Sequence, residues 1–212
     1  SPVRGSRYRF SIEQTQGTAS FTTVIADWRR YFAPTKNLTI GVRTIHYGRY
    51  GLSPEESTSD GFGMLRPLFL GYETFIRGYA YESFSASECS PPGSNSGGSC
   101  MAFNRLQGQQ LAVANLELRI PLVGVEQYGL INFQFVPVEL VAFADAGLAW
   151  DSDNPPVLAF SRSGYERVPV FSTGISARFN VLGFLILEAY YAYPWQRPQK
   201  SWHWGFNIAP GW

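Results

Sequence analysis

Few residues of this chain could serve as a catalytic base. The sequence contains two histidines, His46 and His203, and histidine is the commonest general base near neutral pH. Neither has a serine or aspartate partner at a suggestive spacing, although a triad can also be assembled in space from distant positions. We therefore expect no enzyme activity, and both histidines are better explained as polar residues near strand ends. Loss of a hydrolytic activity on mutating either one would overturn this.

The two cysteines, Cys89 and Cys100, flank residues 90–99, a segment of serine, glycine, proline and asparagine. Two cysteines this close in a loop of turn-forming residues predict a disulfide formed in an oxidising compartment, with two free thiols as the alternative. We expect neither a metal ion nor a cofactor.

Charged residues recur at alternate positions within apolar stretches. Successive side chains of a strand point to opposite faces, so each such stretch would have one apolar and one polar face. The polar face would line an interior and would carry Glu117, Arg119, Glu139, Asp145, Arg178 and Glu188.

The amino-acid composition indicates that these apolar stretches are not transmembrane helices. Aromatic residues make up 16 % of the 212 residues and charged residues only 16 %, against a typical charged share of about 25 %. Hydrophobic residues reach 45 %, yet no run approaches the ~18 residues of a transmembrane helix. The net charge of +1 gives no reason to expect a nucleic-acid partner.

The alternation predicts eight strands and no helix of useful length. A transmembrane β-barrel is favoured over a soluble β-sandwich because several strands exceed ten residues and aromatics such as Trp28, Trp150 and Trp202 gather near strand ends. In a sandwich these aromatics would form the core. The expected strands span about 7–17, 20–32, 37–50, 109–122, 132–150, 169–181, 184–195 and 202–212.

A long irregular segment, about residues 52–107, separates the third strand from the fourth. A loop of this length is usually functional. It contains the run Ile76-Arg77-Gly78-Tyr79. We call residues 52–107 the lid loop.

Four features together resemble a known family. They are Ile76-Arg77-Gly78-Tyr79, the run Phe143-Ala144-Asp145-Ala146-Gly147, the run Glu117-Leu118-Arg119-Ile120-Pro121-Leu122 and the terminal Trp212. In order and spacing they resemble the C-terminal half of the bacterial surface-antigen superfamily, the outer-membrane assembly and translocation barrels of the BamA and TamA type. The resemblance covers essentially the whole chain, which we treat as a single barrel domain, residues 1–212.

The resemblance implies a sixteen-stranded antiparallel barrel whose lid loop joins the eleventh and twelfth strands. Three strands before the loop and five after it match strands nine to sixteen, so the chain would be half a barrel or a miniature eight-stranded one. An eight-stranded interior is filled by side chains. A loop of some fifty residues would therefore lie mostly outside the miniature version.

By the same resemblance, Arg77 enters the barrel and pairs with Asp145, which pins the lid loop. Gly78 would allow a tight turn, Tyr79 would pack against the wall, and Gly147 completes the motif around Asp145. The alternative is an exposed loop arginine and an unrelated interior aspartate.

The last strand resembles the C-terminal signal read by the barrel-assembly machinery during biogenesis, although an ordinary final strand explains the same pattern. Its alternating signal residues are Trp204, Phe206, Ile208 and Trp212.

We therefore expect a protein of the bacterial outer membrane that acts in insertion, assembly or translocation of proteins. The alternative is an anchor or scaffold for an N-terminal domain or partner subunit, and a passive pore is a weaker possibility that single-channel currents would test. Expected partners are outer-membrane lipid, the assembly machinery, and a protein substrate or a subunit that completes the barrel.

Overall fold

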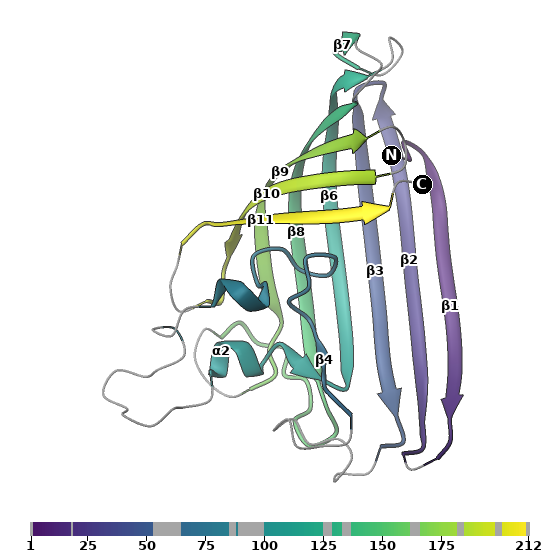
Figure 1. Cartoon of the computed structure of the whole chain (residues 1–212), viewed down its shortest axis with the longest axis vertical. Coiled ribbons are helices and arrows are strands. Elements are labelled where there is room, and N and C mark those ends of the chain that lie inside the picture. Colours follow the sequence, from purple (N-terminus) through teal and green to yellow (C-terminus); the bar gives the residue numbers. More distant parts are fainter. Residues whose placement is uncertain are drawn as a thin grey trace.

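The computed structural model describes residues 2–17, 19–52, 65–84, 88, 100–124, 129–132, 137–161, 166–181, 185–197 and 201–210. Eight antiparallel strands form one sheet in the order β1-β2-β3-β6-β8-β9-β10-β11. The sheet twists strongly, so that β1 to β3 run along the long axis of the molecule and β9 to β11 cross it (Figure 1). The strands span Gly5–Thr15, Phe21–Thr35, Leu38–Tyr50, Gln110–Gly124, Val138–Trp150, Val170–Val181, Leu185–Pro194 and His203–Pro210.

The predicted fifth strand begins too early. It was expected from about residue 132, but β8 begins at Val138, and β7 (Ile131–Asn132) pairs separately and in parallel with the end of β6. The β6–β8 register shifts between Pro121 and Val123. Proline has no backbone N–H to give to the ladder, which accounts for an irregularity at this position.

The two faces of the sheet differ as the alternation predicted. On the outer face Leu116, Leu140 and Ile175 are 45 %, 39 % and 54 % exposed. Their chain neighbours Glu117 and Val141 on the inner face are buried. An apolar outer face and a partly polar inner face are the arrangement of a membrane barrel wall.

The sheet is open. Within the described residues, β1 pairs with β2 and β11 pairs with β10, and no pairing joins β1 to β11. The chain therefore does not close a miniature eight-stranded barrel by itself. Both edge strands expose large apolar side chains, namely Tyr8, Phe10 and Ile12 on β1 and Trp204, Phe206 and Ile208 on β11.

The lid loop contains short elements that the sequence did not predict. They are β4 (Leu68–Phe69), the 3-10 helix η1 (Tyr81–Ser83), α2 (Met101–Asn104) and β5 (Gln107–Gly108), with β4 paired to β5. In the described part of the chain, no helix is long and apolar enough to cross a bilayer.

The lid loop packs on an apolar part of the inner face. Its buried residues Leu68, Leu70, Ile76, Tyr79 and Leu106 form one cluster with wall residues Ile45, Leu111, Val113, Ala149 and Val170. The inner face is thus apolar beneath the lid and charged farther along the strands. The apolar part is a packed core, because the chain's own loop covers the inner face there.

Candidate functional site

Arg77 belongs to the lid loop, and its side chain extends to the wall strand β8. Its Nε and Nη2 each donate a hydrogen bond of 2.8 Å to Asp145, and its backbone N–H donates another of 3.2 Å to Asp145 Oδ2. Asn115 Nδ2, one strand away on β6, donates to Asp145 Oδ1 and to the Phe75 carbonyl. Asp145 therefore holds both the side chain and the backbone of the lid at this point.

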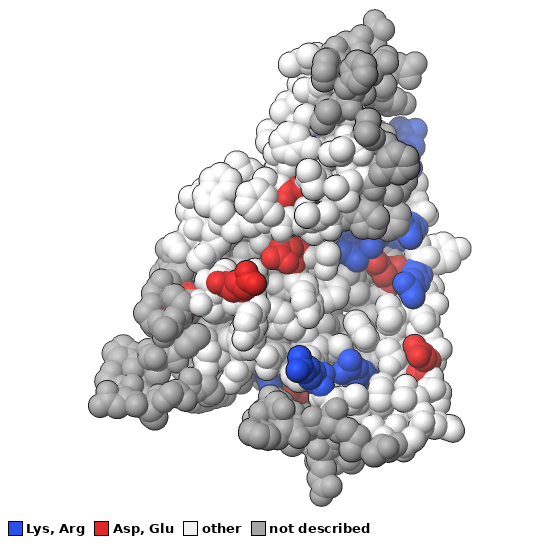
Figure 2. Space-filling model, in the orientation of Figure 1, with Lys and Arg blue, Asp and Glu red and all other residues white. Residues whose placement is uncertain are grey.

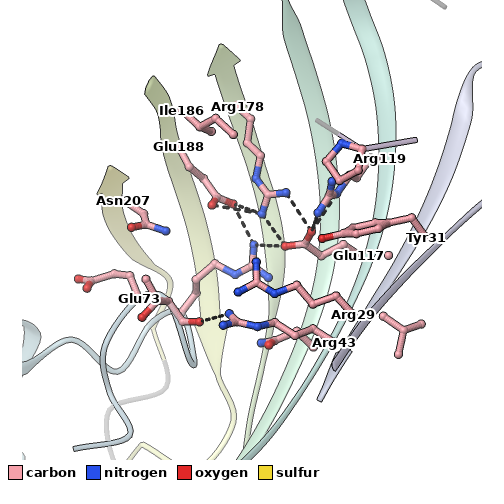
Figure 3. Close-up of a pocket in the computed structure, with 16 residues that line it drawn as sticks. Arg29, Tyr31, Arg43, Glu73, Glu117, Arg119, Arg178, Ile186, Glu188 and Asn207 are labelled. Atoms are coloured by element: carbon pink, nitrogen blue, oxygen red, sulfur yellow. Dashed lines mark hydrogen bonds and ion pairs between the residues drawn. The ribbon is translucent and has the colours of Figure 1, made fainter. Parts of the chain in front are cut away.

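Two further carboxylates reach the same guanidinium. Arg77 Nη1 lies 2.9 Å from Glu188 Oε1 on β10 and 3.1 Å from Glu117 Oε1 on β6. Arg178 on β9 bridges both glutamates, and Arg119 bonds Glu117 at 2.7 Å (Figure 3). We call these six residues the anchor network: Arg77, Glu117, Arg119, Asp145, Arg178 and Glu188.

The anchor network is buried and electrically balanced, with three arginines against three carboxylates. Arg77 is 3 % exposed, and its guanidinium carbon stacks 3.6 Å from the centre of the Phe143 ring. Burial works to lower the pKa of Arg77, but the neighbouring carboxylates, Asp145 first, outweigh it and raise the pKa, so the charge is retained. A buried pair of this kind fixes geometry more surely than it adds stability.

Two glycines of the motifs allow the close approach of lid and wall. Gly78 has a φ of +85°, a conformation that favours glycine. A Cβ on Gly147 would come within 2.1 Å of Ile76 Cδ1 and 2.9 Å of Leu70 Cδ1. The apolar part of the lid therefore sits directly on the β8 backbone at Gly147.

Tyr79 lies beside the anchor network and joins the lid to β9 and to the connection after β10. Its hydroxyl donates to the Phe171 carbonyl at 3.0 Å and lies 3.2 Å from Gln196 Oε1, while the Gln196 backbone N–H donates to it at 3.3 Å. Burial raises the pKa of Tyr79, so its hydroxyl stays protonated and remains a donor at neutral pH.

A second buried ion pair was not predicted. Arg197, which follows β10, is fully buried, and its Nη2 lies 2.5 Å from Glu88 Oε2. It also donates to the Gly78 carbonyl at 3.1 Å and to the Ser83 carbonyl at 2.6 Å. The sequence gave no signal for this pair, because neither residue lies in an alternating strand or a recognisable motif.

Several residues that the sequence analysis singled out as site residues lie outside the anchor network. Glu139 is on the inner face opposite Arg178 in register, but no ion pair of Glu139 is found among the described residues, and its Oε2 is buried without a hydrogen bond. Trp204, Phe206 and Ile208 lie on the outer face of the edge strand β11, and Trp212 is outside the described residues. Cys100 is disulfide-bonded, but Cys89 also lies outside the described residues, so their pairing stays a prediction.

The two histidines are not brought together. His46 Nε2 lies 2.6 Å from the Tyr50 hydroxyl and its ring stacks on Trp150, whereas His203 Nε2 lies 3.3 Å from Ser201 Oγ at the start of β11. In the ranges that the structure describes, no group of His, Cys, Asp and Glu is arranged to hold a metal ion.

A cavity of about 270 Å³ opens beside the anchor network on the inner face (Figure 3). It is lined by arginines and glutamates from both halves of the sheet and by the lid residues Glu73 and Thr74. Such a lining can hold charged groups through hydrogen bonds and ion pairs.

An antiparallel sheet with an apolar outer face, whose charged inner face grips its own loop, has the features of an outer-membrane barrel wall. Comparison with protein families agrees, since the Omp85 superfamily domain matches residues 1–211. The chain belongs to the Omp85 superfamily, which confirms the resemblance to surface-antigen barrels. This bacterial family works in outer-membrane protein assembly and translocation, and its members are generally not enzymes. No curated protein matches the chain.

Proposed function

We propose that this chain forms part of the wall and the lid of a bacterial outer-membrane barrel that inserts or translocates proteins. The observation that carries the proposal is the anchor network, in which Arg77 of the lid loop bonds carboxylates from three wall strands. Because β6, β8 and β10 meet at one lid side chain, movement of the lid and movement of the wall are coupled.

In the first part of the proposed mechanism, the docked lid holds the inner face of the sheet in one conformation. The second part depends on the two edge strands, β1 and β11. The unpaired backbone groups of β1 and β11 favour pairing with another strand, which is the chemistry of β-augmentation. In a closed barrel, an upstream segment of the same protein or a partner subunit would occupy these edges. A substrate strand would compete for the same backbone hydrogen bonds.

The test uses the full-length protein in vesicles of outer-membrane-like lipid. The rate at which an unfolded eight-stranded barrel inserts is followed by its heat-modifiable gel mobility. We expect Arg77→Asp and Asp145→Arg to slow insertion strongly. The double variant Arg77→Asp with Asp145→Arg should recover part of the rate, because the opposite charges face each other again. Normal rates in both single variants would contradict the proposal.

An anchor or scaffold role is the second candidate. It is favoured by the number of ties between the lid and the wall, since Arg77, Tyr79 and the Arg197–Glu88 pair all hold the lid in place. A lid held at so many points suits a static plug. In this case wild-type protein would not accelerate insertion, and the Arg77 variants would still reach the outer membrane with their attached domain or subunit.

A further inference from the structure

The connection between β8 and β9 carries an exposed apolar segment. Residues 155–160 read Pro-Pro-Val-Leu-Ala-Phe and include no charged or polar side chain. Leu158 is 86 % exposed, Phe160 is 60 % exposed and Val157 is 39 % exposed. A single exposed apolar side chain is ordinary, but a contiguous group marks a surface that meets a partner or a membrane. We call residues 155–160 the apolar tip.

Hydrogen bonds at its base hold the apolar tip in a defined position. The backbone N–H of Val157 donates to the Arg167 carbonyl at 2.8 Å. The Asp151 carboxylate accepts from the backbone N–H groups of Asp153 at 3.1 Å and Asn154 at 2.8 Å. Asp151 and Arg167 are both buried and form an ion pair at 3.3 Å. The exposed apolar side chains are therefore presented by a bonded loop.

The apolar tip adjoins the outer face of the sheet. The Phe160 ring stacks on the Phe171 ring of β9, with centroids 6.2 Å apart and planes at 26°. Phe171 points outward, since its neighbour Ser172 is buried on the inner face. The Trp195 backbone N–H donates to the Phe171 carbonyl at 3.0 Å, and the Trp195 ring packs edge-on against Tyr193. Aromatics at strand ends mark the boundary between hydrocarbon and water, so the tip lies beside that boundary.

The chemistry of the apolar tip matches lipid better than protein. Acidic and basic side chains gather on the face of the sheet that carries the lid (Figure 2). The outer face beside the tip is apolar, with Phe171, Ile175 and Phe179 of β9 36 %, 54 % and 38 % exposed. A protein interface normally adds polar side chains at its rim, and the tip has none. Hydrocarbon accepts such a surface because no charged side chain has to be desolvated.

The loop that carries the apolar tip is also bonded to the lid. Arg105, which follows α2, donates from Nη1 to the Ser161 carbonyl at 3.2 Å. On the other side Arg167 donates to the Asn104 carbonyl at the end of α2. A contact between the tip and the membrane would thus steady one side of the lid.

We propose that the apolar tip inserts into the membrane leaflet beside the ends of β8 and β9 and contacts lipid acyl chains. This goes beyond the proposed function, because it assigns a lipid-binding surface outside the strands and requires only that the wall lie in a bilayer. Apolar groups anchored at a membrane surface reach roughly 5–10 Å into the boundary between headgroups and acyl chains. Leu158, the most exposed of these side chains, is the residue expected to enter the lipid.

The experiment places an environment-sensitive fluorophore on Leu158→Cys in the full-length protein, reconstituted in lipid vesicles. Lipid with a nitroxide near the headgroup end of its acyl chain should lower the fluorescence about twofold or more, whereas aqueous iodide should have little effect. The matched control is Asp153→Cys, an exposed position on the same loop, where iodide should quench and the nitroxide lipid should not. Leu116→Cys on the outer face of β6 is the reference for a position in the bilayer.

Equal quenching by iodide at Leu158→Cys and Asp153→Cys would place the apolar tip in water and overturn the inference. Protection of Leu158→Cys from both quenchers would mean that a protein surface covers the tip, which also overturns it. The reference position separates this inference from the proposed function. If the nitroxide lipid quenches Leu116→Cys but not Leu158→Cys, only the role of the tip is lost. If it quenches neither, the sheet is not a membrane wall and both proposals fail.

Discussion

Replacing Asp145 with asparagine should release the lid at the anchor network. Asp145 is 2 % exposed and accepts three hydrogen bonds from Arg77 and one from Asn115. Asparagine keeps the shape but removes the charge and replaces one acceptor oxygen with a donor NH₂ group. Breaking a buried ion pair costs about 3 to 5 kcal/mol.

The lower end of that range applies, because Glu117 and Glu188 still contact Arg77. A loss of about 3 kcal/mol corresponds to a roughly 150-fold rise in the undocked fraction of the lid. Hydrogen exchange measures this directly, since the backbone amide of Arg77 itself donates to Asp145. We expect exchange at this amide to accelerate by about two orders of magnitude in Asp145→Asn.

The matched control is Asp153→Asn, because Asp153 is exposed in the segment after β8. It should leave the Arg77 amide protected. Equal protection in wild type and Asp145→Asn would refute the reasoning, because the carboxylate would then not hold the lid.

Three further predictions concern the lid contacts. Gly147→Ala should destabilise the protein by about 1 to 3 kcal/mol through overpacking against Ile76, and adding Ile76→Val should restore part of the loss in denaturant titrations. Arg197→Gln should expose the lid to limited proteolysis because the buried Glu88 loses its ion pair with Arg197, and unchanged cleavage would contradict this. Burial raises the pKa of Tyr79, so its contribution is complete below the unfolded pKa of about 10 and is lost as pH rises above it. Melting temperatures from pH 8 to 11 should therefore fall less steeply in Tyr79→Phe than in wild type.

The face of the sheet to which each strand residue points could be predicted from the sequence, because side chains alternate between only two faces. Leu116 and Leu140 lie outward and Glu117 and Asp145 inward, as the alternation required. The approach of Arg77 to Asp145 was expected from the family motifs, and the structure places the two in contact.

What covers a face could not be predicted in the same way. Leu111 and Val113 point to the inner face by their place in the alternation, and the lid buries them there. The alternation predicts the face to which a side chain points, but it does not predict which residues pack against that side chain. The packing partner depends on how a loop of about fifty residues folds back onto the sheet, and the alternating pattern carries no information about that.

Side-chain contacts that depend on strand register or on the path of a long loop could not be predicted from the sequence either. The alignment of Arg7, Arg29 and Arg43 follows from the β1–β2 and β2–β3 registers, which the lengths of two turns determine. Glu88 and Arg197 are 109 residues apart, and both lie outside the strands of the sheet. Neither arrangement leaves a periodic signal in a single sequence.

The most direct test of the account is site-directed spin labelling along residues 112–120 of β6 in lipid bilayers. Collision with oxygen reports contact with hydrocarbon, and collision with a water-soluble nickel chelate reports contact with water. The account predicts a period of two, with high oxygen access at Ala112, Ala114, Leu116, Leu118 and Ile120 and low oxygen access at the positions between them. Equal access at successive positions, or Leu116 shielded from both probes, would contradict it.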